Sequence, residues 1–212
     1  MEYVHKLDAG KHANELESLK TYVHDAYGFL KDIFNASDVQ SPKVKVCKDA
    51  KNKYNTKNGT VILSQNLLKE NPAERAHTIG EEVGHYLHFK LNPDIQQLRY
   101  ESDTISRLAV SNFAEMIGAY AGFLWLEDRC GKKISYNAAK QWLATGSNQL
   151  AALMANGQSQ SGINREHVIG YSLAAQTYLN DVDKPANERL PLAQLSRIRD
   201  LETIQKVMGV DE

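Results

Sequence analysis

The 212-residue sequence predicts an α+β fold that is mostly α-helical, with one small antiparallel sheet packed on a central helix. Long segments repeat apolar residues at three- and four-residue steps, which is the period of an amphipathic helix. Strand-like patterns are confined to one short region near residues 43–63. The length allows one domain with a sizeable core or two small ones, and we expect a single domain over residues 1–212. The hydrophobic content of 42% excludes wholesale disorder.

The first predicted element is a long helix over residues 16–34. Its apolar residues fall on one face, and Pro42 follows as a structural break. A helix with a single apolar face is stable when that face packs on the rest of the protein.

Two short strands are expected next, at residues 43–48 and 60–63. The first alternates lysine with valine or cysteine, and a polar loop that ends in Asn58 and Gly59 precedes the second. This pattern predicts an antiparallel hairpin. The alternating lysines are typical of an exposed edge strand that charge protects from aggregation.

Helices account for the remainder of the predicted fold. Pro72 can begin a helix over residues 73–89, which ends before Pro93. A longer helix is expected to begin at Asp94 or Ser102 and to end at Glu127. Three C-terminal helices are then expected over residues 136–154, 165–179 and 186–207. Within the single domain, residues 1–92 would carry the site and residues 93–212 would complete its cleft.

Composition excludes several classes of protein. The 25 basic and 26 acidic residues leave a net charge of −1, whereas a general nucleic-acid binder usually has a basic excess. Cys47 and Cys130 are too few for a disulfide framework or a four-cysteine zinc site. The most apolar stretch, residues 108–126, is interrupted by Glu115 and two other polar residues, so we expect a buried helix and no membrane partner. We therefore expect a cytoplasmic protein.

The most informative segment has the sequence HTIGEEVGHYLH. On a helix, Glu81 and His85 are i,i+4 neighbours with Cβ atoms about 5–6 Å apart, so both side chains can bind one metal ion. Glu82 lies roughly 100° around the helix axis, where it can hold a water molecule without ligating the metal. Gly80 and Gly84 are unfavourable inside a helix, which indicates that another element approaches this face closely.

A third ligand is expected from the long helix that follows. Glu115 is the one acidic residue in an otherwise apolar run, and burying an unpaired carboxylate costs several kcal/mol. A metal ion would be a suitable partner. Glu101 is an alternative ligand, and a tyrosine or histidine is an alternative partner for Glu115.

This segment resembles the active-site helix of the zincin metallopeptidases, the HExxH proteins. It is especially similar to that of small intracellular members, in which the helix has a sequence like TLAHELGHYLLH. Glu81 replaces the first histidine, so the motif here is EExxH. The preceding residues 58–64, NGTVILS, also resemble the edge strand of that family. The likeness extends over roughly residues 44–126.

The resemblance implies a role for each residue of the motif. Glu81 and His85 would be metal ligands, and Glu82 would be the general base that takes a proton from the attacking water. Glu115 would be the third ligand, as in the glutamate-type zincins. The implied cofactor is Zn²⁺, although the carboxylate of Glu81 could favour a harder divalent ion such as Mn²⁺.

Four further residues are candidates for supporting roles. His77 could ligate the metal only in a distorted helix, and His88 could orient a ligand, but packing against a neighbouring element explains both. His167 and Tyr171 are also i,i+4 neighbours. Zincin peptidases often use a late histidine or tyrosine to stabilise the oxyanion, which makes this pair a catalytic candidate beside ordinary core packing.

These inferences predict a metal-dependent hydrolase that cleaves a peptide or protein substrate. The substrate would pair in extended form with the strand at residues 60–63. An alternative of another class is a catalytically inactive, zincin-derived binding or regulatory protein. A third possibility is a helical structural protein in which the EExxH motif is accidental.

Overall fold

The computed structural model describes residues 2–48, 50–101, 104–156 and 165–209. The fold belongs to the α+β class and is mostly helical, as the sequence predicts. Its elements are α1 (Glu2–Ile33), β1 (Lys43–Cys47), β2 (Lys53–Asn55), β3 (Thr60–Ser64), η1 (Gln65–Lys69), α2 (Pro72–Leu91), α3 (Ile95–Glu101), α4 (Thr104–Cys130), α5 (Lys132–Asn156), α6 (Arg165–Asp181), η2 (Ala186–Glu188), α7 (Leu192–Leu195) and α8 (Leu201–Val207).

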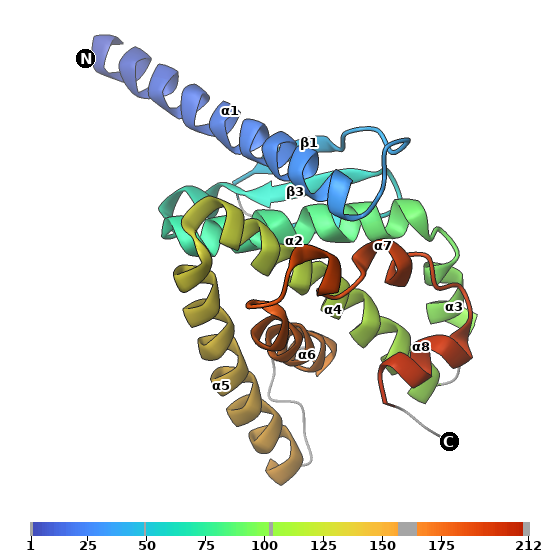
Figure 1. The fold of residues 1–212 in the computed structure, drawn as a ribbon. Coiled ribbons are helices and arrows are strands. Elements are labelled where there is room, and N and C mark those ends of the chain that lie inside the picture. Colours follow the sequence, from blue (N-terminus) through green and yellow to red (C-terminus); the bar gives the residue numbers. More distant parts are fainter. Residues whose placement is uncertain (1, 49, 102–103, 157–164, 210–212) are drawn as a thin grey trace.

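The elements form layers around α2. Helix α1 and the sheet lie on one side of α2, while α4 and α6 lie on the other (Figure 1). Helix α1 contacts the rest of the fold through one face, because its buried apolar residues recur at helical spacing. These residues are Leu19, Val23, Ala26 and Leu30.

The sheet differs from the predicted antiparallel hairpin. Its strand order is β1-β3-β2, and β1 pairs with β3 in parallel, so the predicted pairing of residues 43–48 with 60–63 has the wrong direction. The short strand β2 is the antiparallel partner of β3. A tight turn at Gly59, which has a φ of +66°, joins these two strands and makes their pairing local. Strand β3 is therefore central, and β2 forms an edge.

Helices α2 and α4 pack at very short range through two pairs of glycines. A Cβ atom at Gly84 would lie 2.6 Å from the Cβ of Ala121, and a Cβ at Gly122 would lie 2.9 Å from a backbone oxygen of α2. Gly80 and Gly118 face the partner helix in the same way. The sequence-based inference that an element approaches Gly80 and Gly84 closely is thus confirmed, and that element is α4.

Helix α4 is buried over most of its length, as expected for the apolar run at residues 108–126. The long helix predicted from Asp94 or Ser102 is not a single helix from Asp94, because α3 precedes α4 as a separate short element; its alternative start, Ser102, lies outside the described residues. None of the helices within the described ranges is both long enough and apolar enough to cross a membrane.

The C-terminal region departs from the single helix predicted over residues 186–207. It contains η2, α7 and α8, because Pro191 disfavours a continuous helix and Asp200 caps α8 by accepting a hydrogen bond from Thr203 N at 2.7 Å. Arg189 also pairs with Glu127 of α4 at 2.9 Å, which ties this region to the central helix.

The close packing of α2 on α4 predicts that Gly84→Ala is destabilising. The added methyl group would overlap Ala121, and the separation of the helices should lower the free energy of unfolding by about 1–3 kcal/mol. Gly28→Ala in α1 is the matched control, because no atom lies within 4 Å of its added Cβ. That variant should gain about 0.5–1 kcal/mol from helix propensity. Urea denaturation measures both changes, and equal effects at the two sites would contradict the packing argument.

Candidate metal centre

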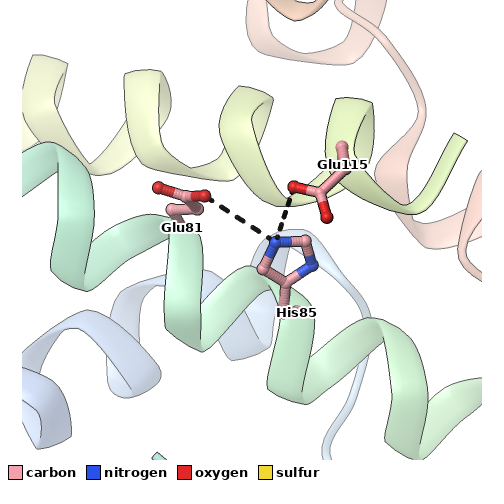
Figure 2. A group of neighbouring side chains, drawn as sticks. All are labelled: Glu81, His85 and Glu115. Carbon is pink, nitrogen blue, oxygen red and sulfur yellow. Dashed lines mark ion pairs between the residues drawn. The ribbon is translucent and has the colours of Figure 1, made fainter. Parts of the chain in front are cut away.

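The predicted metal ligands converge between α2 and α4. Glu81 and His85 lie one turn apart on α2, and Glu115 faces them from α4 (Figure 2). His85 Nε2 is 3.8 Å from Glu81 Oε1 and 3.6 Å from Glu115 Oε2. One donor atom from each residue lies within 4.8 Å of the other two. The structure therefore brings together the three side chains that the sequence selected.

The spacing of these donors fits a small divalent ion. Ligands about 2.0–2.1 Å from a tetrahedral ion are separated by about 3.3 Å. The two distances from His85 Nε2 exceed that separation by only a few tenths of an ångström. These two distances are compatible with one divalent cation, and the third separation, between donor atoms of the two carboxylates, is within 4.8 Å.

Glycine creates the space that His85 occupies. A Cβ atom at Gly118 would lie 2.5 Å from His85 Cε1, so the imidazole ring rests directly on the backbone of α4. Glu81 and His85 are 6% and 9% exposed. The same close approach of the helices thus positions the ligands and shields them from solvent.

The charges of the three ligands stabilise one another in the metal-free protein. Burial acts to raise the pKa of Glu81 and of Glu115, but the nearby imidazole of His85, joined at Glu115 by that of His167, outweighs it and lowers both values. Burial acts to lower the pKa of His85, and the two carboxylates raise it well above its ordinary value. An imidazolium therefore lies between two carboxylates. A metal ion must displace its proton, so affinity should fall at acidic pH.

Glu82 lines the same cavity as the three ligands. The backbone N–H of Tyr54 in β2 donates a hydrogen bond to its carboxylate. Its Oε2 atom is buried and has no hydrogen-bond partner among the described residues. Burial and the charge of Glu81 raise the pKa of Glu82 to about 8. A carboxyl group with a pKa near neutrality is suited to proton transfer.

The two catalytic candidates on α6 also reach this cluster. His167 Nδ1 lies 2.8 Å from Glu115 Oε2, and the hydroxyl of Tyr171 hydrogen-bonds to Glu81. Close packing positions them, because a Cβ at Gly170 would lie only 2.4 Å from the Cβ of Glu115. Burial and the carboxylate of Glu81 raise the pKa of Tyr171 well above its ordinary value. In this structure both residues therefore contact ligand carboxylates, and their oxyanion role stays a prediction.

The other histidines of α2 are packing residues. The ring of His77 lies 4.5 Å from that of Phe123, and the ring of His88 lies 5.7 Å from that of Phe113. Neither belongs to the donor group found in the described part of the chain. The side chain of Glu101, the alternative third ligand, lies outside the described residues.

Sequence reasoning missed two features that shape the site. The first is Gly118, which makes room for His85. The sequence contains a signal for it, because Gly118 and Gly122 have the same four-residue spacing as Gly80 and Gly84. The contact from Tyr54 to Glu82 had no such signal, because β2 was not predicted.

The cluster opens into a cavity of about 270 Å³. The residues that line it come from β2 and its flanks, α2, α3, α4 and α6. They are Asn52, Lys53, Tyr54, Thr56, Glu81, Glu82, His85, Phe89, Gln96, Ala114, Glu115 and His167. The cavity therefore lies between β2 and the helices that carry Glu82 and the three candidate ligands.

Comparison with family models, with curated proteins and with solved structures found no match to this chain. The donor set, its burial and the adjoining cavity define a candidate metal centre by their geometry alone. The assignment of a function depends on that geometry and on the chemistry of the residues.

The burial of His88 predicts a specific acid sensitivity. Burial lowers the pKa of His88 from 6.5 to about 3, so below pH 6.5 the unfolded chain binds a proton that the folded protein excludes. At pH 5 this difference should reduce the free energy of unfolding by about 2 kcal/mol. In EDTA, the free energy of unfolding should fall less for His88→Leu than for wild type when the pH is lowered from 7.5 to 5. Urea denaturation at the two pH values measures this difference. An unchanged pH dependence in the variant would contradict this assignment.

Proposed function

We propose that this protein is a metal-dependent hydrolase that cleaves peptide bonds. The observation that supports it best is the convergence of Glu81, His85 and Glu115 on one point, with the carboxylate of Glu82 on the same cavity. The resemblance of the EExxH helix to that of the zincins supports a peptide substrate. In this proposal Glu81, His85 and Glu115 hold the ion.

The ligand set influences which ion would bind. A divalent ion at this position would polarise the scissile carbonyl and make water a better nucleophile. Glu81 and Glu115 supply two negative charges, which match those of the ion, and His85 supplies a neutral nitrogen once it has lost its proton. The set suits Zn²⁺, and its two carboxylates would also suit a harder ion such as Mn²⁺.

Glu82 would serve as the general base. It would take a proton from the attacking water and return it to the leaving amine. The hydrogen bond from the Tyr54 N–H holds one carboxylate oxygen, while the other is free of partners in the described part of the protein. His167, which is half-exposed at the cavity, would donate a hydrogen bond to the developing oxyanion. Tyr171 would hold Glu81 in position.

The arrangement of the sheet changes where the substrate would lie. The sequence suggested the strand at residues 60–63, but β3 is paired on both sides and cannot accept another strand. Strand β2 pairs with β3 on one side only, and its Tyr54 N–H donates a hydrogen bond to Glu82. We therefore place the extended substrate along β2, where backbone hydrogen bonds can hold it beside the general base.

A second candidate function is a binding or regulatory protein without catalytic activity. The observation that favours it is the position of His85, which as an imidazolium pairs with both Glu81 and Glu115 in the absence of a metal. The buried charges are then balanced by a proton. The carboxylate of Glu81 would also make any bound metal ion a weaker Lewis acid than a zinc ion that is held mainly by histidines.

Metal binding separates the two candidates. Protein purified without chelator should contain about one equivalent of a divalent ion by elemental analysis, and Zn²⁺ or Mn²⁺ should raise the Tm of the apo protein. Glu115→Gln should abolish both effects because it removes an anionic ligand. Glu74→Gln, at an exposed position in the first turn of α2, is the control and should retain them. The absence of bound ion and of stabilisation in wild type would favour the inactive protein.

Glu82→Gln tests the catalytic proposal directly. This variant should still bind metal but should lower kcat for a mixed peptide library by about 10²–10⁴-fold, because the base is lost. Mass spectrometry of the products with and without EDTA measures the cleavage that depends on metal. Cleavage at the wild-type rate by Glu82→Gln would show that Glu82 is not the base.

A further inference from the structure

We propose that a groove beside the metal centre selects substrates with an acidic residue near the scissile bond. The residues that would bind this acidic side chain are Lys51 and Lys53. The inference rests on the proposed function, and it specifies the class of peptide that the site would accept.

The groove is a second cavity of about 590 Å³ next to the metal site. Asn52, Lys53 and His167 line both cavities, so the two spaces share a wall. This volume is in the range of pockets that hold small ligands or part of a peptide. A peptide that lies along β2 with its reacting bond at Glu82 would extend into the groove.

The base of the groove is apolar and aromatic. Trp142 of α5 and Tyr171 of α6 pack with ring centroids 4.8 Å apart, and Val168 continues this surface. A close contact between α5 and α6 supports it, because a Cβ at Gly146 would lie 2.3 Å from Ser172 Oγ. The groove therefore has an apolar surface that can contact the aliphatic part of a substrate side chain.

The rim of the groove carries positive charge. Lys51 and Lys53 are exposed, and neither is part of an ion pair with a side chain that the structure describes. No carboxylate is among the described residues that line the groove. The acidic residues Glu81, Glu82 and Glu115 instead line the adjoining cavity, whose wall Lys53 and His167 share with the groove. This separation of charge complements a substrate that has an anionic side chain beside a neutral peptide bond.

The position of the lysines is fixed by the sheet. Asn52 lies between them, and its Oδ1 accepts a hydrogen bond from Ser64 N at 2.7 Å, which anchors the segment to the end of β3. Lys53 is the neighbour of Tyr54, whose N–H reaches Glu82. At about 3.3 Å per residue, a paired peptide would place an acidic side chain about one to three residues from the reacting bond.

Matched fluorogenic peptides test this inference on the metal-loaded protein. The peptides differ only at one position near the cleavage site, which is Glu, Gln or Lys. We expect kcat/KM to be about five- to tenfold higher for the Glu peptide than for the Gln peptide at low salt, and lowest for the Lys peptide. The double variant K51Q/K53Q should reduce the Glu-to-Gln ratio to about one. The control K57Q, in the turn after β2 and outside the groove lining, should keep the wild-type ratio.

Binding measurements distinguish a failure of this inference from a failure of the proposed function. Fluorescence anisotropy with Glu82→Gln protein should show the same preference for the Glu peptide, and 300 mM salt should weaken it. Peptide cleavage with equal rates for Glu and Gln would keep the hydrolase and overturn the acidic preference. Preferential binding of the Glu peptide without cleavage by wild type would support the groove and overturn the hydrolase. Tighter binding of a single-stranded oligonucleotide than of the Glu peptide would overturn the assignment of a peptide substrate.

Discussion

The contact between α2 and α4 is the constraint on which the rest of the structure depends. Paired glycines let the two backbones approach until Gly84 meets Ala121 and the His85 ring rests on Gly118. A side chain at any of these positions would increase the separation of the helices. Glu115 would then lie beyond the reach of His85, and the cavity wall formed by α4 would move. Core packing and site geometry are therefore set by the same contact.

This contact also buries several carboxylates, and the cost of burying their charge determines the electrostatics of the site. Three carboxylates are placed in or beside a water-poor space, where unpaired charge is costly. His85 compensates Glu81 and Glu115 when it is protonated, and a divalent ion can replace that proton. Burial and the neighbouring charge of Glu81 raise the pKa of Glu82 to about 8. In the proposed function, the metal ion would replace the proton of His85, and the carboxyl group of Glu82 would transfer the proton of the attacking water.

The small sheet connects this cluster to the protein surface. Strand β2 contacts Glu82 through the Tyr54 N–H and borders the groove through Lys53. Since β3 is central and β1 covers its other side, the free edge on the side of the site belongs to β2. The acidic side chains lie in the buried cluster, and the basic side chains lie at the rim of the groove. This arrangement follows from the positions of α2 and β2. A single three-residue strand therefore lies between the buried cluster and the groove that we propose as a substrate-binding region.

The sequence by itself determined the α+β class, most helices up to α6 though not the separation of α3 from α4, and the convergence of Glu81 and His85, because helical periodicity and i,i+4 spacing are local properties. Glu115 could be selected because a lone carboxylate in a buried apolar helix needs a partner. Tertiary structure decided the parallel pairing of β1, the contact from Tyr54 to Glu82 and the fit of His85 on Gly118. Those features join residues that are far apart in the chain or depend on strand pairing, and periodicity carries no information about which distant surfaces meet.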